Sequence, residues 1–427
     1  MFTTLRNAWK IPELRKKLLF TLFILLIFRA GNAIPVPYVN VALLSEYFNT
    51  QLSNTVLGLY NAMSGSAFAR ASLFALSIQP YINSSIIMQL LTIAIPALER
   101  LQKEGGEDGQ RKIASYTRYV TVVLGLLMGY AYYVMLRNYG LLANDGFLYG
   151  LVIVLSFTAG SAFVMWLGEQ ITEFGIGNGI SIILFANIIS RLPSGVSTTV
   201  TNIINGGMSW LAGIGIVVGM LLIIMFIVFI TNSERRIPVQ YAKRVVGRKV
   251  YGGQNTHLPI KVNMSGVMPI IFAQSIASLP ATIAAFLPAA TSGFGKFVSG
   301  VIDTNGVVYA VAYFLLIVAF SYFYAAIQYN PVELANNLKK NGGFVPGFRP
   351  GKPTADFIHK VISKITLFGA LYLAIIALLP IIVGNILNYN ALSIGGTSVI
   401  IVVGVALETV KVLEAQMMMR HYKGFLE

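Results

Sequence analysis

The chain has 427 residues, of which 56% are hydrophobic and 11% are charged, and its mean hydropathy is +0.71. A soluble domain carries about 25% charged residues, so this composition excludes an ordinary soluble protein and predicts a polytopic membrane protein. The chain has no cysteine, which excludes disulfides and thiolate metal sites, and its formal net charge is +15.

Apolar segments of about 20 residues, long enough to cross a bilayer as helices, recur along the whole chain. The first follows Arg15, Lys16 and Lys17, and Arg29 interrupts the region where a signal peptide would be cleaved, so we expect an uncleaved span. The fifth is short and opens with the glycine-rich sequence GIGNG. The expected fold class is therefore an all-α polytopic membrane bundle. The ten predicted spans are Leu18–Val36, Leu73–Ile95, Ala114–Leu136, Phe147–Leu167, Ile176–Leu192, Trp210–Thr231, Ser265–Ala289, Val307–Gln328, Ile365–Ile386 and Thr397–Leu413.

The distribution of basic residues predicts the orientation of these spans. An even number of spans places both termini on one side, and if that side is the cytoplasm, 26 of the 31 Lys and Arg residues lie in cytoplasmic segments. Two cytoplasmic loops, at about 232–263 and 329–364, are basic and larger than a turn requires. Their charges either fix orientation alone or form a docking surface for an acidic partner or RNA, and we favour the docking surface.

The predicted second span is too polar to face lipid along its whole length. It has Pro80 at its centre, and Ile78, Ile82, Ser85 and Gln89 share one face at helical spacing. Its polar side chains are Gln79, Asn83, Ser84, Ser85 and Gln89. We predict that this face lines a gated path through the membrane. An apolar patch just before it is too short to span, and is either an interfacial helix or, as we favour, a re-entrant segment.

Five spans followed by five would form two halves of opposite orientation around a central path. The expected single membrane domain then divides into residues 1–195, with spans one to five, and residues 196–427, with spans six to ten. The second and seventh spans correspond in this arrangement. Both carry proline and scattered polar residues, with Pro80 in one and Pro269 and Pro280 in the other.

The sequence contains no catalytic constellation. Its histidines, His257, His359 and His421, lie in loops or the tail, and no HExxH, GxSxG or P-loop motif occurs. We expect no enzyme activity, no cofactor and no metal site. A secondary transporter for small solutes is the alternative, and it would need a buried charged site at mid-membrane. Charged residues are few there, which favours a path closed by apolar packing.

Several long motifs, in one order along essentially the full chain, resemble the SecY/Sec61-alpha family of protein-translocation channels. They include FRAGNAIPVP, SIQPYINSSIIMQLL, GEQITEFGIGNGISI, YAKRVVGRKVYGGQNTHLPIKVNMSGVMPIIFAQSI, NPVELANNLKKNGGFVPGFRPG and GGTSVIIVVGVALETVK. The resemblance implies a pore subunit that conducts unfolded secretory proteins across the membrane. It also implies a lateral gate that releases signal sequences and transmembrane segments into lipid, within an hourglass of two inverted five-helix halves.

The resemblance assigns roles to residues of this sequence, position by position. The implied pore ring is Ile78, Ile82, Leu184, Ile271, Ile401 and Ala406. The implied plug, at about 55–70, includes Val56, Leu57, Leu59, Tyr60 and Met63. The implied lateral gate includes Asn83, Gln89, Asn263 and Leu279. The implied docking surface for SecA or the ribosome includes Lys243, Arg244, Arg248, Lys249 and Arg349.

Within these sets, Asn83 is expected opposite Leu279, and Gln89 is expected to form a hydrogen bond to Asn263 across the closed gate. Ala406 is smaller than the residue that the family commonly has. Ser77 and Gln79 also depart from the family's usual Gly and Met.

The resemblance also implies partners and a location. The partners are the SecE and SecG subunits, the SecA motor ATPase, the ribosome, signal peptides, unfolded client polypeptides and membrane lipids, in a bacterial plasma membrane. No nucleotide-binding motif occurs in the chain, so we expect a motor or the ribosome to supply the driving energy.

Overall fold

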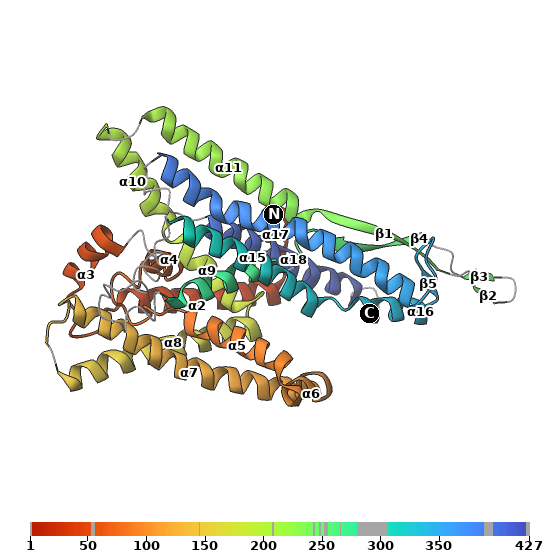
Figure 1. Ribbon diagram of the computed structural model, residues 1–427, viewed down its shortest axis with the longest axis horizontal. Helices are drawn as coiled ribbons and strands as arrows, with labels where there is room; N and C mark the ends of the chain where they lie inside the picture. Colours follow the sequence, from red (N-terminus) through yellow and green to blue (C-terminus); the bar gives the residue numbers. More distant parts are fainter. Residues whose placement is uncertain are drawn as a thin grey trace.

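In a computed structural model the chain folds into a bundle of helices, and a narrow β-sheet projects from one end of it (Figure 1). The structure describes residues 2–52, 56–144, 146–206, 209–241, 244–246, 249–251, 255–264, 266–280, 306–387 and 396–423. The first elements are α1 (Phe2–Lys10), α2 (Pro12–Ala33), α3 (Val41–Tyr47), a π-helix (Phe48–Leu52), α4 (Val56–Met63), α5 (Gln79–Ala94), α6 (Pro96–Glu104), α7 (Gly106–Asn138), α8 (Phe147–Phe174), α9 (Gly179–Ile189) and α10 (Leu192–Ile204). The later elements are α11 (Trp210–Asn232), β1 (Glu234–Tyr241), β2 (Arg244–Val246), β3 (Lys249–Tyr251), β4 (Asn255–Lys261), α12 (Met268–Ala277), α15 (Val307–Gln328), α16 (Pro331–Lys340), β5 (Gly343–Phe344), α17 (Lys352–Leu387) and α18 (Gly396–Lys423).

The protein is a multi-pass membrane protein. Among the described residues six helical stretches are long and apolar enough to cross a bilayer, and there are seven if the bent pair α5–α6 counts as one span. The six are Gly106–Asn138, Phe147–Phe174, Gly179–Ile204, Trp210–Asn232, Val307–Lys340 and Lys352–Leu379. This count does not reach the ten predicted spans. One reason is that α12 has 10 described residues, and the predicted Ser265–Ala289 extends beyond the described part of the chain.

The helix predicted at Leu73–Ile95 starts later than expected. Residues 73–78 form turns, and α5 begins at Gln79 with Pro80 in its first turn. A proline fits there because the first N–H groups of a helix have no partner within the helix. The expectation that Pro80 lies at the centre of a span is therefore wrong. At its other end α5 bends by 99° into α6, where Pro96 occupies the first turn.

The turns before α5 pack directly against α8, and this contact requires glycine. A Cβ atom at Gly160 would lie 1.9 Å from the carbonyl oxygen of Leu73, a distance that no real contact reaches. The backbones of α8 and of the segment leading into α5 therefore touch. This contact fixes the position at which α5 enters the bundle.

We expect Gly160→Ala to destabilise the protein, because the added methyl group forces the two backbones apart. Overpacking of this kind costs about 1–3 kcal/mol, so the midpoint of thermal unfolding in detergent should fall by several degrees. The matched control is Gly215→Ala on α11, where a Cβ meets nothing within 4 Å and alanine improves helix propensity. Equal midpoints of thermal unfolding for the two variants would contradict the close backbone contact between Gly160 and Leu73.

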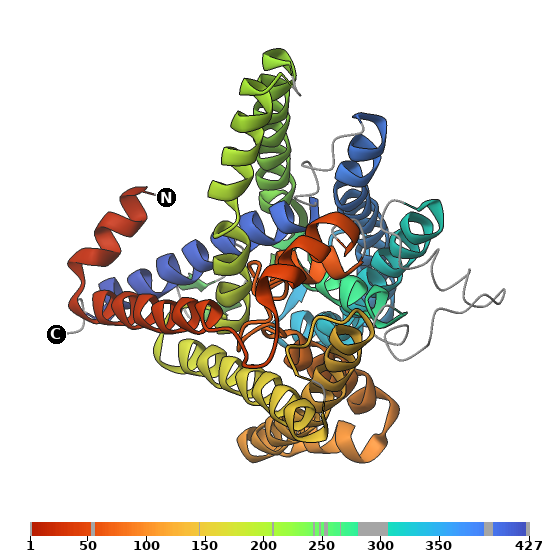
Figure 2. The same ribbon diagram turned by 90° about the vertical axis from the view of Figure 1, so that its left-hand side faces the viewer.

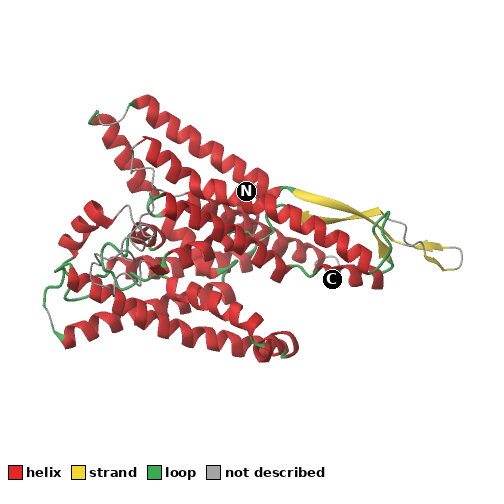
Figure 3. Ribbon diagram, in the orientation of Figure 1, coloured by secondary structure: helices red, strands yellow, loops and turns green. Residues whose placement is uncertain are grey.

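The two large loops expected at about 232–263 and 329–364 form one structural unit. In the three-stranded sheet, β1 pairs antiparallel with β4 on one side and with β5 on the other, and β2 and β3 form a small hairpin beyond it (Figure 3). A separate apolar cluster fastens the sheet to α17. Its buried members are Ile237, Ile260, Met264, Val345, Ile358 and Ile362. The first loop thus consists largely of strands, whereas α17 begins well inside the second.

Helix α11 lies at the rim of the bundle (Figures 1 and 2) and exposes large apolar side chains along its length, as a lipid-facing helix does.

The first and last described helices contact each other. Helix α1 packs against α18, with Thr4 Oγ1 donating to Glu414 Oε1 at 3.2 Å. The two terminal helices therefore lie at the same end of the molecule.

Candidate pore and lateral gate

Five of the six residues in the implied pore ring are buried in one apolar cluster. Their exposed fractions are 1% for Ile78, 5% for Ile82, 1% for Leu184, 3% for Ile271 and 1% for Ile401. They come from the start of α5, from α9, from α12 and from α18. Residues far apart in the sequence, from both proposed halves, therefore contribute to one continuous apolar core.

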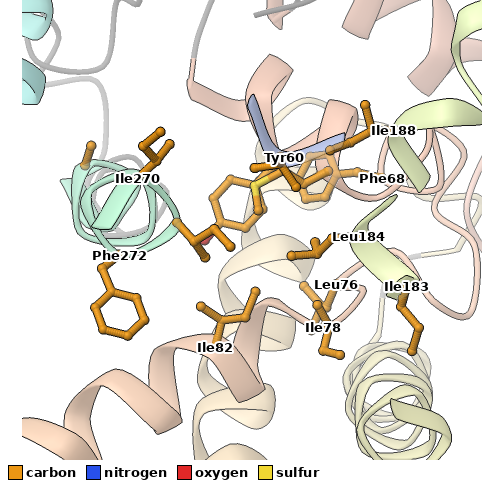
Figure 4. Close-up of a cluster of buried hydrophobic side chains, with 14 of the residues drawn as sticks. Tyr60, Phe68, Leu76, Ile78, Ile82, Ile183, Leu184, Ile188, Ile270 and Phe272 are labelled. Carbon is orange, nitrogen blue, oxygen red and sulfur yellow. The ribbon is translucent and has the colours of Figure 1, made fainter. Parts of the chain in front are cut away.

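The members of this set differ in how they face the cluster. Figure 4 shows Ile82 and Leu184 in the same region as Tyr60, with α12 beside them. Ile78 lies lower and reaches toward α8, since a Cβ at Gly168 would be 3.4 Å from its Cδ1 atom. Ala406 lies farther along α18 and is half-buried. Most of these side chains are branched and apolar, and they pack by non-directional dispersion contacts.

The segment predicted as the plug is helix α4 followed by buried turns. Tyr60 and Met63 are buried and Leu57 is partly buried in the same apolar cluster as the ring. The side chains of Val56 and Leu59 lie outside the described set. The predicted re-entrant segment is therefore a short helix packed into the apolar core of the bundle.

Hydrogen bonds hold this segment on several sides. Asn61 Oδ1 accepts from the backbone N–H of Ala69 at 3.0 Å, which ties the helix to the turn that follows it. The Tyr132 hydroxyl of α7 donates to the carbonyl oxygen of Phe68, and the rings of these two residues stack with centroids 4.3 Å apart. The segment is thus anchored to α7 as well as to the ring.

The expected lateral-gate contacts are not the ones that form. The Gln89 side chain donates from Nε2 to Ser85 Oγ of its own helix at 3.4 Å, so the predicted Gln89–Asn263 hydrogen bond is wrong. The Asn83 amide points toward Met128 of α7, with its Nδ2 atom 3.8 Å from the sulfur, instead of toward Leu279. Leu279 is 43% exposed. Helical periodicity predicted which face of α5 each side chain occupies, but it did not predict which residue each side chain contacts.

A polar contact between α5 and α12 lies instead at Gln79, and the preceding turn contacts α9 through Ser77; both positions depart from the family pattern. Gln79 Nε2 donates to Ser275 Oγ of α12 at 3.1 Å. Ser77, which has a φ of 49°, accepts from Asn187 Nδ2 of α9 at 3.2 Å. A small polar residue tolerates this left-handed conformation better than a bulky one. The unusual composition of this turn was the signal in the sequence that pointed to these contacts.

A cavity of about 530 Å³ opens beside the ring. Its walls come from α9, α11, α15, α18 and the segment after β4, and they include Asn178, Lys261, Asn263 and Glu408. Asn263 of the implied gate therefore faces this polar cavity. Polar side chains that line a water-filled cavity can form hydrogen bonds to water in place of hydrogen bonds to protein.

Arg349 of the implied docking surface lies on a braced turn. Its carbonyl oxygen accepts from the buried Thr354 hydroxyl at 2.8 Å, and Phe348 stacks on Phe357 with centroids 4.2 Å apart. The Arg349 side chain is exposed. Arg244 and Lys249 lie on β2 and β3, at the far end of the projecting sheet. Lys243 and Arg248 fall outside the described residues.

This fold defines a polytopic helical membrane protein with an apolar core to which both parts of the chain contribute. The chain belongs to the SecY family: the SecY family model matches residues 72–410. It is 44% identical to the protein translocase subunit SecY of Streptomyces scabiei, with 100% of each chain covered. It is 43% identical to that of Halalkalibacterium halodurans over 100% of each chain. It is 41% identical to that of Thermotoga maritima, with 100% of this chain and 98% of the relative covered.

Solved structures share the fold at lower sequence identity. A structure described as a protein conducting channel matches with a TM-score of 0.65 at 17% identity, covering 94% of this chain and 92% of the other. Canine Sec61 in a ribosome–channel complex matches with a TM-score of 0.60 at 15% identity, covering 94% and 92%. Full-length relatives that are translocase subunits make this chain a protein-translocation channel subunit.

Proposed function

We propose that this chain is the conducting subunit of a bacterial protein translocase, through which unfolded polypeptides cross the plasma membrane. The observation that supports the proposal is that Ile82, Leu184, Ile271 and Ile401, from four elements, are all buried in one continuous apolar core, to which residues of helix α4 also belong. A ring of branched apolar side chains grips a passing chain of any sequence, because dispersion has no directional requirement. When empty, it closes and excludes water, which blocks ions.

The proposal includes the finer architecture that the family resemblance implies. Ten spans would form two inverted halves, residues 1–195 and 196–427, with both termini in the cytoplasm. The ring residues Ile78 and Ala406 would join the four named above. The plug would be about residues 55–70, with Val56, Leu57 and Leu59 beside Tyr60 and Met63. These assignments rest on the motif match and on the packing of α4 against the ring.

The lateral gate is proposed between α5 and α12, which contact each other in the closed bundle. Signal peptides and transmembrane segments would leave for membrane lipid there, past Asn83, Gln89, Asn263 and Leu279. SecA or the ribosome would dock on the projecting sheet and on Arg349, and SecE and SecG would complete the complex. The canine relative was solved in a ribosome–channel complex, which supports the ribosome as a partner.

The test is reconstitution into liposomes with SecE, SecG, SecA and ATP. We expect an unfolded secretory protein to become protease-protected inside the vesicles only when this chain is present. Radiolabelled small solutes should not accumulate in the same vesicles. Solute accumulation without protein import would instead support a secondary transporter.

A further inference from the structure

A groove between α7 and α8 lies outside the apolar ring and plays no part in the proposed pore. Its volume is about 600 Å³, and it lies beside the turn that joins the two helices, at the end of the bundle away from the projecting sheet (Figure 1). Its lining includes Leu126 and Tyr130 of α7 and Leu151 and Leu155 of α8, and these side chains are 39–49% exposed. Both helices are long and apolar enough to span a membrane, so the groove belongs to a face that is suited to hydrocarbon.

Glycines at the contact between the two helices create the groove. A Cβ at Gly129 of α7 would lie 3.3 Å from the carbonyl oxygen of Val154, so the two backbones approach closely there. A Cβ at Gly150 of α8 would lie 2.7 Å from Cζ of Tyr133, so that ring lies directly over the glycine. Larger side chains on either side of this contact form the walls. The shape therefore follows from helix packing and needs no bound molecule to form it.

The groove has the length of one bilayer leaflet. Leu126 and Arg137 both line it, and they lie about 16 Å apart along the axis of α7 at the helical rise of about 1.5 Å per residue. The hydrocarbon core of a bilayer is about 30 Å thick, so one leaflet accounts for about 15 Å. An acyl chain matches this length, whereas a transmembrane helix of a partner would use a surface along the whole thickness.

The charge at one end of the groove indicates the headgroup. Arg137 is exposed and lies in the last turn of α7, one residue before the helix ends at Asn138. Among the described residues that line the groove, it is the one charged residue. A guanidinium group pairs with phosphate through two parallel hydrogen bonds. A headgroup with a net negative charge therefore matches this end, whereas an ammonium group would meet no carboxylate among those residues.

We propose that the groove between α7 and α8 binds one anionic phospholipid of the leaflet away from the projecting sheet. The lipid phosphate pairs with Arg137, and one acyl chain lies along the walls formed by Tyr130 and Leu151. The site is separate from the apolar ring and from Arg349, so the proposal does not depend on the proposed function. A lipid that binds only the folded chain also stabilises it.

Native mass spectrometry of the purified full chain in detergent tests the headgroup contact. The lipids added are phosphatidylglycerol and phosphatidylethanolamine with the same two acyl chains, and the measured quantity is the dissociation constant of the first bound lipid. We expect the wild type to prefer phosphatidylglycerol by about tenfold, the effect of a hydrogen-bonded charged group. Arg137→Gln should remove this preference, and Arg137→Lys should keep part of it. The control is Lys339→Gln, at an exposed position of α16, which should keep the full preference.

A larger side chain in the groove tests the chain contact. Leu151→Trp fills the groove, so binding of both lipids at this site should be lost. Leu148→Trp is the matched control, because Leu148 lies on the same helix, is 72% exposed and does not line the groove. The midpoint of thermal unfolding without lipid shows that each variant is folded. Added phosphatidylglycerol should raise this midpoint for the wild type and Leu148→Trp, and should not raise it for Arg137→Gln or Leu151→Trp.

Two results would overturn the proposal. If Arg137→Gln keeps the preference for phosphatidylglycerol, the lipid binds elsewhere on this basic chain. If the wild type loses its bound lipid when the other translocase subunits join it, the groove holds a helix of a subunit. Retention of the lipid by the wild-type complex, with loss from Arg137→Gln and Leu151→Trp, supports the site. None of these measurements uses protein import, so their outcome is independent of the test of the proposed function.

Discussion

Ile82→Asn is expected to make the idle channel leak ions. Ile82 is 5% exposed and lies in the same buried apolar cluster as Leu184 (Figure 4), so an amide at this position would bring water into the proposed constriction. A buried amide without a partner costs about 1–3 kcal/mol, so the population of open or wetted channels should rise by about tenfold. The measurement is the conductance of the reconstituted complex in a planar bilayer without a client.

The control for this prediction is Ile82→Val, which keeps a branched apolar side chain and should leave the conductance close to that of the wild type. A core Ile→Val change costs about 0.5–1.5 kcal/mol, so the protein stays folded. If Ile82→Asn conducts no more than Ile82→Val, the constriction lies elsewhere and the ring assignment is wrong.

Arg349→Glu is expected to abolish most SecA-driven export while leaving the protein inserted and stable. The side chain is exposed, and the turn beneath it is held by Thr354 and by the Phe348–Phe357 stack. Substitutions at such surface positions usually change stability by less than about 0.5 kcal/mol. The new charge repels an acidic docking partner, so initial rates of import into proteoliposomes should fall at least about tenfold.

The control is Lys112→Glu, which makes the same change of charge at an exposed position of α7, away from the projecting sheet. Its import rate should stay near that of the wild type at equal protein level. Normal SecA-dependent import by Arg349→Glu would exclude this turn from the docking surface.

Apolar runs in the sequence predicted several helices closely. The predicted Trp210–Thr231 corresponds to α11 at Trp210–Asn232, and the predicted Val307–Gln328 coincides with α15. These segments are uniformly apolar, so their ends are marked by the first polar residues. The start of α5 was mispredicted because the residues before Pro80 are mostly apolar, as residues within a membrane-spanning helix are. Their turns depend on a tertiary contact with Gly160 of α8.

The candidate ring was proposed from the motif match, since each ring residue lies in or beside one of the matching motifs. The partners of polar side chains could not be assigned in this way. The faces of α5 on which Gln89 and Asn83 lie could be predicted from the helical period. The hydrogen-bond partner of each, however, lies in its own half of the chain. The pairing of β5 with β1 also joins residues more than a hundred positions apart, and local patterns contain no information about such contacts.

The central claim is that polypeptides pass through the space between Ile82, Leu184 and Ile271. The most direct measurement places a photo-crosslinking amino acid at each of these three positions and stalls a secretory chain in the translocating complex. We expect crosslinks from all three positions to the stalled chain. We expect none from Ile317, which is fully buried in α15. Absence of crosslinks from the three ring positions, with the chain nevertheless stalled across the membrane, would exclude this route for the polypeptide.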